Sequence, residues 1–580
     1  MRRIILVPAV ALLLSAILLP ASAGYPVDAA AARTTWTARL ATNGTATISL
    51  PSSGPGTLAL QLRGMSPGTT YPVVLLRGSC APIPYPKLLT LPSQRPTASG
   101  KVSRTFSLTA AQARSVRQAY PSGLIVRLGA LCARFIVPLA PLTLERGDGR
   151  FSLGGRERLL FARNLTAYWQ TDFNEVLALA RAGGSRLVRV QLELGFGDHN
   201  VMTSTGAVDE TWARKWEQVL DQANSEGLYV IVMLAGWCDW NDGDPDLVGH
   251  RWDRNPLNVA NGGSAKSPEE LFQAGSRTQK LWLAWARSLV SRWANRTNIA
   301  AWELFSEVNL ASRVTEQSGV AFVDAAAAAI RSADPLHRPI TASIATFPDW
   351  PSLLGDPNLD FNQVHPYPPS GMLDTALLAD VRAKLAFGKP VLIGESGLSA
   401  APPDGSTLET APRAAIGVRH AIWAGLVSGA MDARALWWQD SVGMYFPNLG
   451  MDWVRGWAHA EVPATRFAAG VADWTGYVPL DATSSATIVG AVVGNATSAI
   501  GWYRDAACEP PDWPVAGPIH GAEVAVTAPG SAARWKIDVN DTASGTRSLA
   551  SMTIERQDGR VRFVLPDFSD DVAFRMTALP

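Results

Sequence analysis

The feature that most constrains the fold of this 580-residue chain is a regular alternation of two patterns between residues 146 and 475. Short runs rich in Val, Ile and Leu predict buried strands, and longer stretches such as 209–227 and 276–296 carry apolar residues at helical spacing. Eight such strand–helix units predict an α/β fold, a (β/α)8 TIM barrel. A doubly wound open sheet is the alternative, but no G-x-G-x-x-G follows the first strand. The predicted strands are LLFARNL (159–165), RLVRVQLEL (186–194), LYVIVML (228–234), IAAWELFSE (299–307), PITASIA (339–345), FNQVHPY (361–367), PVLIGES (390–396) and ARALWWQ (433–439).

A different pattern flanks this region on both sides. Residues 34–145 and 476–580 alternate polar and apolar positions and are rich in turn residues, which predicts an N-terminal all-β domain and a C-terminal β-sandwich domain. Pro- and Gly-containing joints near 141–148 and 476–480 mark the expected boundaries. The first β-domain has no cluster of catalytic residue types, so we expect a spacer or a binding module there. Chemistry is therefore expected in the barrel.

The first 23 residues have the pattern of an export signal. Two arginines precede an apolar stretch and an Ala-Ser-Ala sequence, which predicts a signal peptide over 1–23 and a secreted or extracytoplasmic protein. An uncleaved membrane anchor is the alternative. No other stretch is apolar for about 18 residues, so no membrane association is expected once the signal is removed. A formal charge of +1 without a run of Lys or Arg gives no indication of nucleic-acid binding.

Four cysteines fit an exported protein. Cys80 and Cys132 lie in the predicted N-terminal β-domain, and a disulfide between them is expected to stabilise it by roughly 3–4 kcal/mol. Cys238 and Cys508 are expected to be unpaired. The sequence contains neither C-x-x-C nor H-E-x-x-H, so no metal site is expected.

Two glutamates end predicted strands. Glu307 lies in WELFSEVN (302–309) and Glu395 in VLIGESG (391–397). Side chains at the C-terminal ends of barrel strands meet on one face, and glycosidic bond cleavage needs two carboxylates, one to protonate the leaving oxygen and one to attack or to activate water. Glu303 lies about 13 Å deeper at roughly 3.3 Å per residue, so we expect a buried structural acid with a basic partner.

Four segments, in their order and spacing, resemble a known family. WELFSEVN, QVHPYP, VLIGESG and LWWQD resemble the strand 4, 6, 7 and 8 motifs of clan A glycoside hydrolases, most closely glycoside hydrolase family 5 with its cellulases and mannanases. The resemblance covers roughly 150–475 and implies a retaining double displacement. It implies that Glu307 is the general acid/base and Glu395 the nucleophile.

The resemblance also implies residues that bind the substrate. Arg189 matches the arginine that holds the nucleophile, and His365 and Tyr367 match the strand 6 pair. Trp438 matches the aromatic platform under the sugar, although strand parity alone favours Trp437. Ser306 departs from the pattern, because the family usually has an Asn there that contacts the sugar 2-hydroxyl.

Tryptophans are concentrated in the predicted barrel. Sugar faces stack well on aromatic rings, so the candidate subsite platforms in the loop after strand 3 are Trp237, Trp240 and Trp252. Other tryptophans at helical spacing are expected to pack in the core: Trp282, Trp285 and Trp293.

Together these patterns and the resemblance predict a secreted, retaining glycoside hydrolase that cleaves β-glycosidic bonds in a polysaccharide or oligosaccharide, and we expect a monomer. The chemistry requires no cofactor. Two alternatives remain open: a carbohydrate-binding protein whose hydrolase site is degenerate at Ser306, and a transglycosylase in which a sugar replaces water as the acceptor.

Overall fold

The computed structural model describes residues 33–40, 44–51, 54–77, 87–119, 124–135, 138–165, 173–192, 200–243, 251–345, 349–401, 403, 405–440, 450–515 and 517–580. The chain divides into two compact units, Met1–Val137 and Pro138–Pro580. The region predicted as a barrel and the C-terminal strands thus belong to one unit. No helix in the described ranges combines the length and the apolar character that crossing a membrane requires.

The N-terminal unit consists of two antiparallel sheets with a shared core. Alternate residues are buried, as in the pattern of β3, so each strand turns one face inward, where Ile48, Leu60, Leu75 and Val126 pack together. The unit also contains a helix, α1 (Ala110–Ala119), which the strand-like pattern did not predict. The first sheet has the order β1 (Arg33–Arg39), β2 (Gly44–Pro51), β3 (Gly56–Leu62), β6 (Val102–Leu108), and the second β5 (Lys87–Gln94), β4 (Tyr71–Arg77), β7 (Leu124–Leu128), β8 (Leu131–Arg134).

One of the two cysteines of the predicted disulfide lies in the described residues. Cys132 on β8 is disulfide-bonded. Cys80 lies outside the described residues, so its pairing with Cys132 remains a prediction. Cys238 and Cys508 are buried and form no disulfide, as expected.

Parallel strands form the centre of the second unit, which confirms the predicted α/β class. A six-stranded parallel sheet and a separate parallel pair are described, and every residue of these strands is buried, as expected where both faces are covered. The sheet has the order β15 (Ile340–Thr341), β14 (Ile299–Glu303), β13 (Tyr229–Met233), β12 (Leu187–Gln191), β11 (Leu160–Leu165), β18 (Asp432–Arg434), and the pair is β16 (Asn362–Val364) and β17 (Val391–Ile393).

Backbone hydrogen bonds connect the pair to both edges of the sheet. The Asp360 N–H, next to β16, donates to the Ile340 carbonyl at 2.8 Å, and the Met431 N–H, before β18, donates to the Val391 carbonyl at 2.8 Å. Glu307 and Glu395, which follow β14 and β17, line the same cavity.

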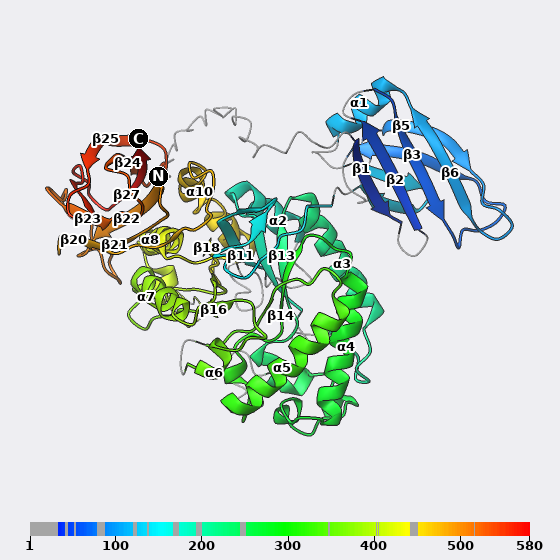
Figure 1. Cartoon of the computed structure of the whole chain (residues 1–580). Helices are drawn as coiled ribbons and strands as arrows, with labels where there is room; N and C mark the ends of the chain where they lie inside the picture. The colour runs from blue at the N-terminus through cyan, green and yellow to red at the C-terminus, as the bar shows by residue number, and fades with distance from the viewer. Residues whose placement is uncertain are drawn as a thin grey trace, which may run out of the picture. The chain divides into compact units, whose positions relative to one another are not determined.

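Helices alternate with the strands and cover them, as Figure 1 shows for α3, α4 and α5. Their apolar faces pack inward: Trp282, Trp285 and Trp293 of α4 are fully buried, which confirms the packing role predicted for them. The main helices are α2 (Phe173–Gly183), α3 (Glu210–Ser225), α4 (Arg277–Trp293), α5 (Glu316–Ala333), α7 (Leu373–Leu385) and α8 (Ala414–Val427).

The C-terminal strands form two antiparallel sheets beside α8 (Figure 1). Trp502 of β22 and Ala573 of β27 share a core with Trp423 of α8, so these strands are continuous with the packing of the parallel-sheet region. The larger sheet has the order β19 (Val478–Pro479), β21 (Ile488–Gly494), β22 (Ser498–Asp505), β27 (Asp571–Leu579), β24 (Arg534–Asp541), β25 (Ser548–Glu555), and the smaller β20 (Ala482–Ser484), β23 (Glu523–Thr527), β26 (Arg560–Val564).

Candidate active site

The two strand-end glutamates, 395 − 307 = 88 residues apart in sequence, meet in space. Glu307 follows β14 and begins the short helix η7 (Val308–Leu310), whereas Glu395 follows β17. One carboxylate oxygen from each, together with a ring nitrogen of His365, lie within 4.8 Å of one another. Both side chains are largely buried, so each carboxylate depends on protein groups for much of its solvation.

The backbone of Glu307 is held in an unusual conformation. Its φ and ψ of 54° and 52° lie in the left-handed region, which is uncommon for a residue with a Cβ atom. The Glu307 N–H donates to the Ser343 hydroxyl at 2.9 Å, and Nδ1 of His365 lies 2.9 Å from Oε1 of its carboxyl. Burial and then the charge of Glu395 raise the pKa of Glu307, although His365 and Arg189 act in the opposite direction. These effects favour a protonated carboxyl, the form a proton donor needs.

Glu395 has a different set of partners. Arg189 Nη1 donates to its Oε1 at 2.8 Å, and the Tyr367 hydroxyl donates to its Oε2 at 3.0 Å. Burial alone would raise the pKa of Glu395, but the charges of His365 and Arg189 and the hydrogen bonds from Arg189 and Tyr367 lower it. Glu395 is therefore kept ionised, the form a nucleophile needs.

Arg189 on β12 connects the acids. Its Nε and Nη2 donate to the two oxygens of Glu303 at 2.6 and 2.8 Å, while Nη1 reaches Glu395. Glu303 is fully buried, which confirms the prediction of a structural acid with a basic partner. Because two of its donor positions are fixed by Glu303, the guanidinium is aimed at Glu395 before any substrate arrives.

Ser306 faces Arg189 as well as the cavity. Its Oγ accepts a hydrogen bond of 2.7 Å from Arg189 Nη2 and lies 3.4 Å from the Ser343 Oγ. Ser343 also donates to Glu303 at 3.2 Å. Ser343 was not predicted as a site residue, and its only signal in the sequence is its place in the segment PITASIA (339–345), two residues after β15.

A cavity of about 350 Å³ opens over the two carboxylates. Both Trp437, which strand parity favoured, and Trp438, which the family resemblance favoured, line this cavity. The Trp438 indole Nε1 donates to the Ser399 carbonyl at 2.7 Å, which fixes the ring orientation. The other lining residues include Gln191, Met233, Trp237, Cys238, Ser306, Leu310, His365, Tyr367 and Ala400.

The expectation for two other tryptophans was wrong. Trp240 and Trp252 are buried in the hydrophobic core, where their ring centroids lie 5.7 Å apart. Trp237, from the same loop, lines the cavity. The sequence of this loop therefore did not predict which tryptophan rings face the cavity, because that depends on how the loop folds back.

The central region of the chain is similar to a known sequence family. Residues 155–424 match the cellulase family (glycosyl hydrolase family 5). The mannan endo-1,4-beta-mannosidase F of Aspergillus fumigatus is 23% identical over 308 residues, a match that covers 45% of this chain and 66% of the relative. A putative mannan endo-1,4-beta-mannosidase 9 of Oryza sativa is 24% identical over 335 residues, covering 50% of this chain and 79% of the relative.

Solved structures share the fold. A glycoside hydrolase superposes with a TM-score of 0.53 at 13% identity, covering 76% of this chain and 97% of that one. A family 5 glycoside hydrolase from Bacteroides vulgatus superposes with a TM-score of 0.51 at 14% identity, covering 76% of this chain and 93% of that one. The superposed part, 76% of this chain, is longer than the region matched by the family, residues 155–424.

Proposed function

Because this protein is a clan A glycoside hydrolase of the family 5 type, we propose that it cleaves β-glycosidic bonds with retention, with Glu395 as nucleophile and Glu307 as general acid/base. The observation that carries the proposal is the approach of the two carboxylates, whose oxygens lie within 4.8 Å. Retaining enzymes keep their carboxyl groups about 5–5.5 Å apart, whereas inverting enzymes need about 6.5–9.5 Å to admit a water.

The first step transfers the sugar to the enzyme. Protonated Glu307 gives its proton to the glycosidic oxygen, while an oxygen of Glu395 attacks the anomeric carbon from the opposite face. The bond from the anomeric carbon to the leaving oxygen breaks, and an ester between the sugar and Glu395 forms. Arg189 and Tyr367 hold the attacking carboxylate in place.

The second step releases the sugar. Glu307, now ionised, removes a proton from a water, whose oxygen attacks the anomeric carbon and displaces Glu395 as a carboxylate. The charge of Glu395 is restored beside Arg189, and the proton returns Glu307 to its starting form. Two displacements leave the product with the configuration of the substrate.

The substrate we propose is a β-1,4-linked mannan. The curated relatives reported above are named as mannan endo-1,4-beta-mannosidases, which supports this choice. The aromatic rings at the cavity, Trp237, Trp437 and Trp438, offer flat apolar faces for successive sugar rings.

Two structural proposals accompany this function. We infer that the eight parallel strands close into a (β/α)8 barrel, supported by the backbone hydrogen bonds that join β16 to β15 and β17 to β18. We also infer that the chain is exported, supported by the signal-like pattern of residues 1–23, which lie outside the described residues.

The test is the anomeric configuration of the product first formed. Proton NMR of fresh digests of mannan, β-glucan and xylan separates the two anomers before they interconvert. We expect mannan to be cleaved fastest and the β-anomer to appear first. If the α-anomer appears first, the enzyme inverts and the assignment of Glu395 as nucleophile is wrong. If none of the three is hydrolysed, the degenerate-site alternative based on Ser306 is favoured.

A further inference from the structure

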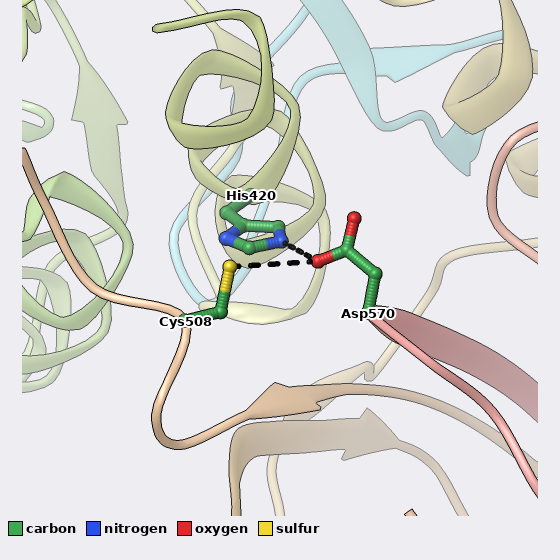
Figure 2. Close-up of side chains that lie close together, drawn as sticks. All are labelled: His420, Cys508 and Asp570. Carbon is green, nitrogen blue, oxygen red and sulfur yellow. Dashed lines mark hydrogen bonds and ion pairs between the residues drawn. The ribbon is translucent and has the colours of Figure 1, made fainter. Parts of the chain in front are cut away.

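A second cluster of reactive side chains lies where α8 meets the C-terminal strands (Figure 2). His420 comes from the middle of α8, Cys508 from the segment after β22, and Asp570 from the residue before β27. The three are far apart in sequence, so short zinc motifs could not reveal them. None of them lines the cavity over Glu307 and Glu395.

The three side chains converge on one point. His420 Nε2 lies 2.9 Å from Asp570 Oδ1, and Cys508 Sγ lies 3.7 Å from the same oxygen, as Figure 2 shows. All three ligand atoms lie within 4.8 Å of one another. Tetrahedral zinc, with bonds of about 2.0–2.2 Å to N or O and about 2.3 Å to S, places neighbouring ligand atoms roughly 3.4–3.6 Å apart. The His420–Asp570 separation is about half an ångström shorter than this geometry requires, and the Cys508–Asp570 separation is close to it.

We propose that His420, Cys508 and Asp570 bind a Zn²⁺ ion that links α8 to the C-terminal strands. Imidazole, thiolate and carboxylate are the ligand types that zinc prefers. His420 and Cys508 are almost fully buried, whereas Asp570 is partly exposed, so a water reaches the fourth position from its side.

Zinc binding displaces the proton of the Cys508 thiol, so one proton is released per ion. The thiolate, the neutral imidazole and the carboxylate are then the ligands.

The surrounding charge also favours a dication. The guanidinium of Arg419 pairs with the second oxygen of Asp570, which leaves Oδ1 directed at the other two ligands. Arg419 is itself near Asp571, with Nε 3.5 Å from Oδ1, and Arg504 pairs with Asp374. In the described surroundings of His420 and Cys508, four carboxylates face two guanidinium groups, so negative charges outnumber positive ones. They are Asp374, Asp505, Asp570 and Asp571 against Arg419 and Arg504.

The experiment measures metal binding by the full chain, so its result does not depend on catalysis. The protein is incubated with Zn²⁺, desalted, and its metal content determined; Co²⁺ is then used as a spectroscopic probe, because only a thiolate ligand produces a sulfur-to-cobalt charge-transfer band. We expect one retained Zn²⁺ per chain and a charge-transfer band with Co²⁺. Cys508→Ser and His420→Gln are expected to lose the retained ion, and Cys508→Ser to lose the band.

Cys238→Ser is the matched control, since Cys238 is the other buried cysteine that forms no disulfide. It is expected to keep both the ion and the band. A metal bound instead by Glu307, His365 and Glu395 would give no thiolate band, so the two sites are distinguishable. Circular dichroism of each metal-free variant checks that it is folded. Wild-type protein that retains no Zn²⁺, or a band that survives Cys508→Ser, overturns the proposal.

Discussion

At the level of single residues, two chemically identical carboxyl groups have different roles in the active site. Glu307 and Glu395 are both buried, yet the pKa of one is raised and that of the other is lowered. The difference comes from their partners. Glu395 has two donors, Arg189 and Tyr367, whereas the side chain of Glu307 contacts His365 and lies near the negative charge of Glu395. Opposed pKa shifts of this kind assign one carboxyl as acid and the other as nucleophile.

Replacing the acids separates their roles. Glu395→Ala is expected to lower kcat by roughly 10⁴–10⁶-fold on every substrate, because the attacking oxygen is absent. Glu307→Ala is expected to spare the first step for aryl glycosides with weakly basic leaving groups, and added azide restores turnover by attacking the glycosyl-enzyme without a general base. Steady-state kinetics with and without azide measure this. Rescue of Glu395→Ala with retained configuration, or failure to rescue Glu307→Ala, contradicts the assignment.

Ser306 offers a second residue-scale prediction. Ser306→Ala removes the hydroxyl that accepts a 2.7 Å hydrogen bond from Arg189 Nη2 in a buried site. A hydrogen bond to a charged group contributes about 1.5–3 kcal/mol. We expect kcat/KM to fall roughly 10- to 100-fold, because the arginine that holds Glu395 is less well fixed. Ser428→Ala, a buried serine at the end of α8, is the control and is expected to leave kcat/KM unchanged. An unchanged kcat/KM in Ser306→Ala would mean that this hydroxyl does not position Arg189.

At the scale of elements, a short helix supports the wall of the cavity. Glu409 lies in η8 (Leu408–Thr410), and its carboxylate accepts hydrogen bonds from the backbone N–H groups of Leu398 and Ser399 at 2.6 and 3.2 Å and from the Gln439 side chain. The Ser399 carbonyl in turn accepts from the Trp438 indole. One buried acid thus joins the segment after β17 to the segment after β18.

Glu409 makes stability depend on pH. Burial raises its pKa from the usual 4.5 to about 7 despite these hydrogen bonds. Because the pKa of Glu409 is higher in the folded state than in the unfolded state, the protonated carboxyl stabilises the fold fully below about pH 4.5. As the pH rises through 7, the free energy of unfolding falls by about 3 kcal/mol. We expect Glu409→Gln to flatten the fall in Tm between pH 4.5 and 7. Thermal melts of both proteins across this range provide the comparison, and parallel pH profiles would contradict the prediction.

At the scale of the whole molecule, the C-terminal strands form part of the packing that supports the catalytic region. Trp502 and Ala573 share a core with Trp423 of α8, and a Cβ on Gly417 of the same helix would lie 2.6 Å from the Trp513 ring. The unit that ends at Val137 has its own core instead. We therefore expect the catalytic region to need the C-terminal strands for its stability, but not the N-terminal unit.

Truncation tests this difference. A chain spanning 138–580 is expected to fold and to keep kcat/KM within about twofold, since the second compact unit is intact. A chain spanning 138–475 is expected to be insoluble or to lose its cooperative melt, because it exposes the side of α8 that Trp502 and Ala573 cover. Expression, calorimetry and activity assays measure the outcome. A soluble and active 138–475 chain would show that the C-terminal strands are dispensable.

Much of the architecture and site was accessible from local patterns. The strand and helix periodicities predicted the parallel α/β class, and the positions of Glu307 and Glu395 at strand ends placed both on one face. Burial of Trp282, Trp285 and Trp293 followed from helical spacing, because it repeats the direction of a side chain every turn. Helix α1 was missed, since a short helix in a strand-rich segment lacks a long periodic signal.

Local periodicity predicted that Glu307 and Glu395 lie beside the C-terminal ends of strands, because such patterns depend on near neighbours in the chain, although β14 and β17 end earlier, at Glu303 and Ile393. Which of these residues touch was settled by tertiary packing. It placed Ser343 under Glu307, directed Ser306 at Arg189, buried Trp240 and Trp252 rather than exposing them, and brought His420, Cys508 and Asp570 together. Such contacts depend on loop paths and on the packing of segments far apart in sequence, for which no local periodicity exists.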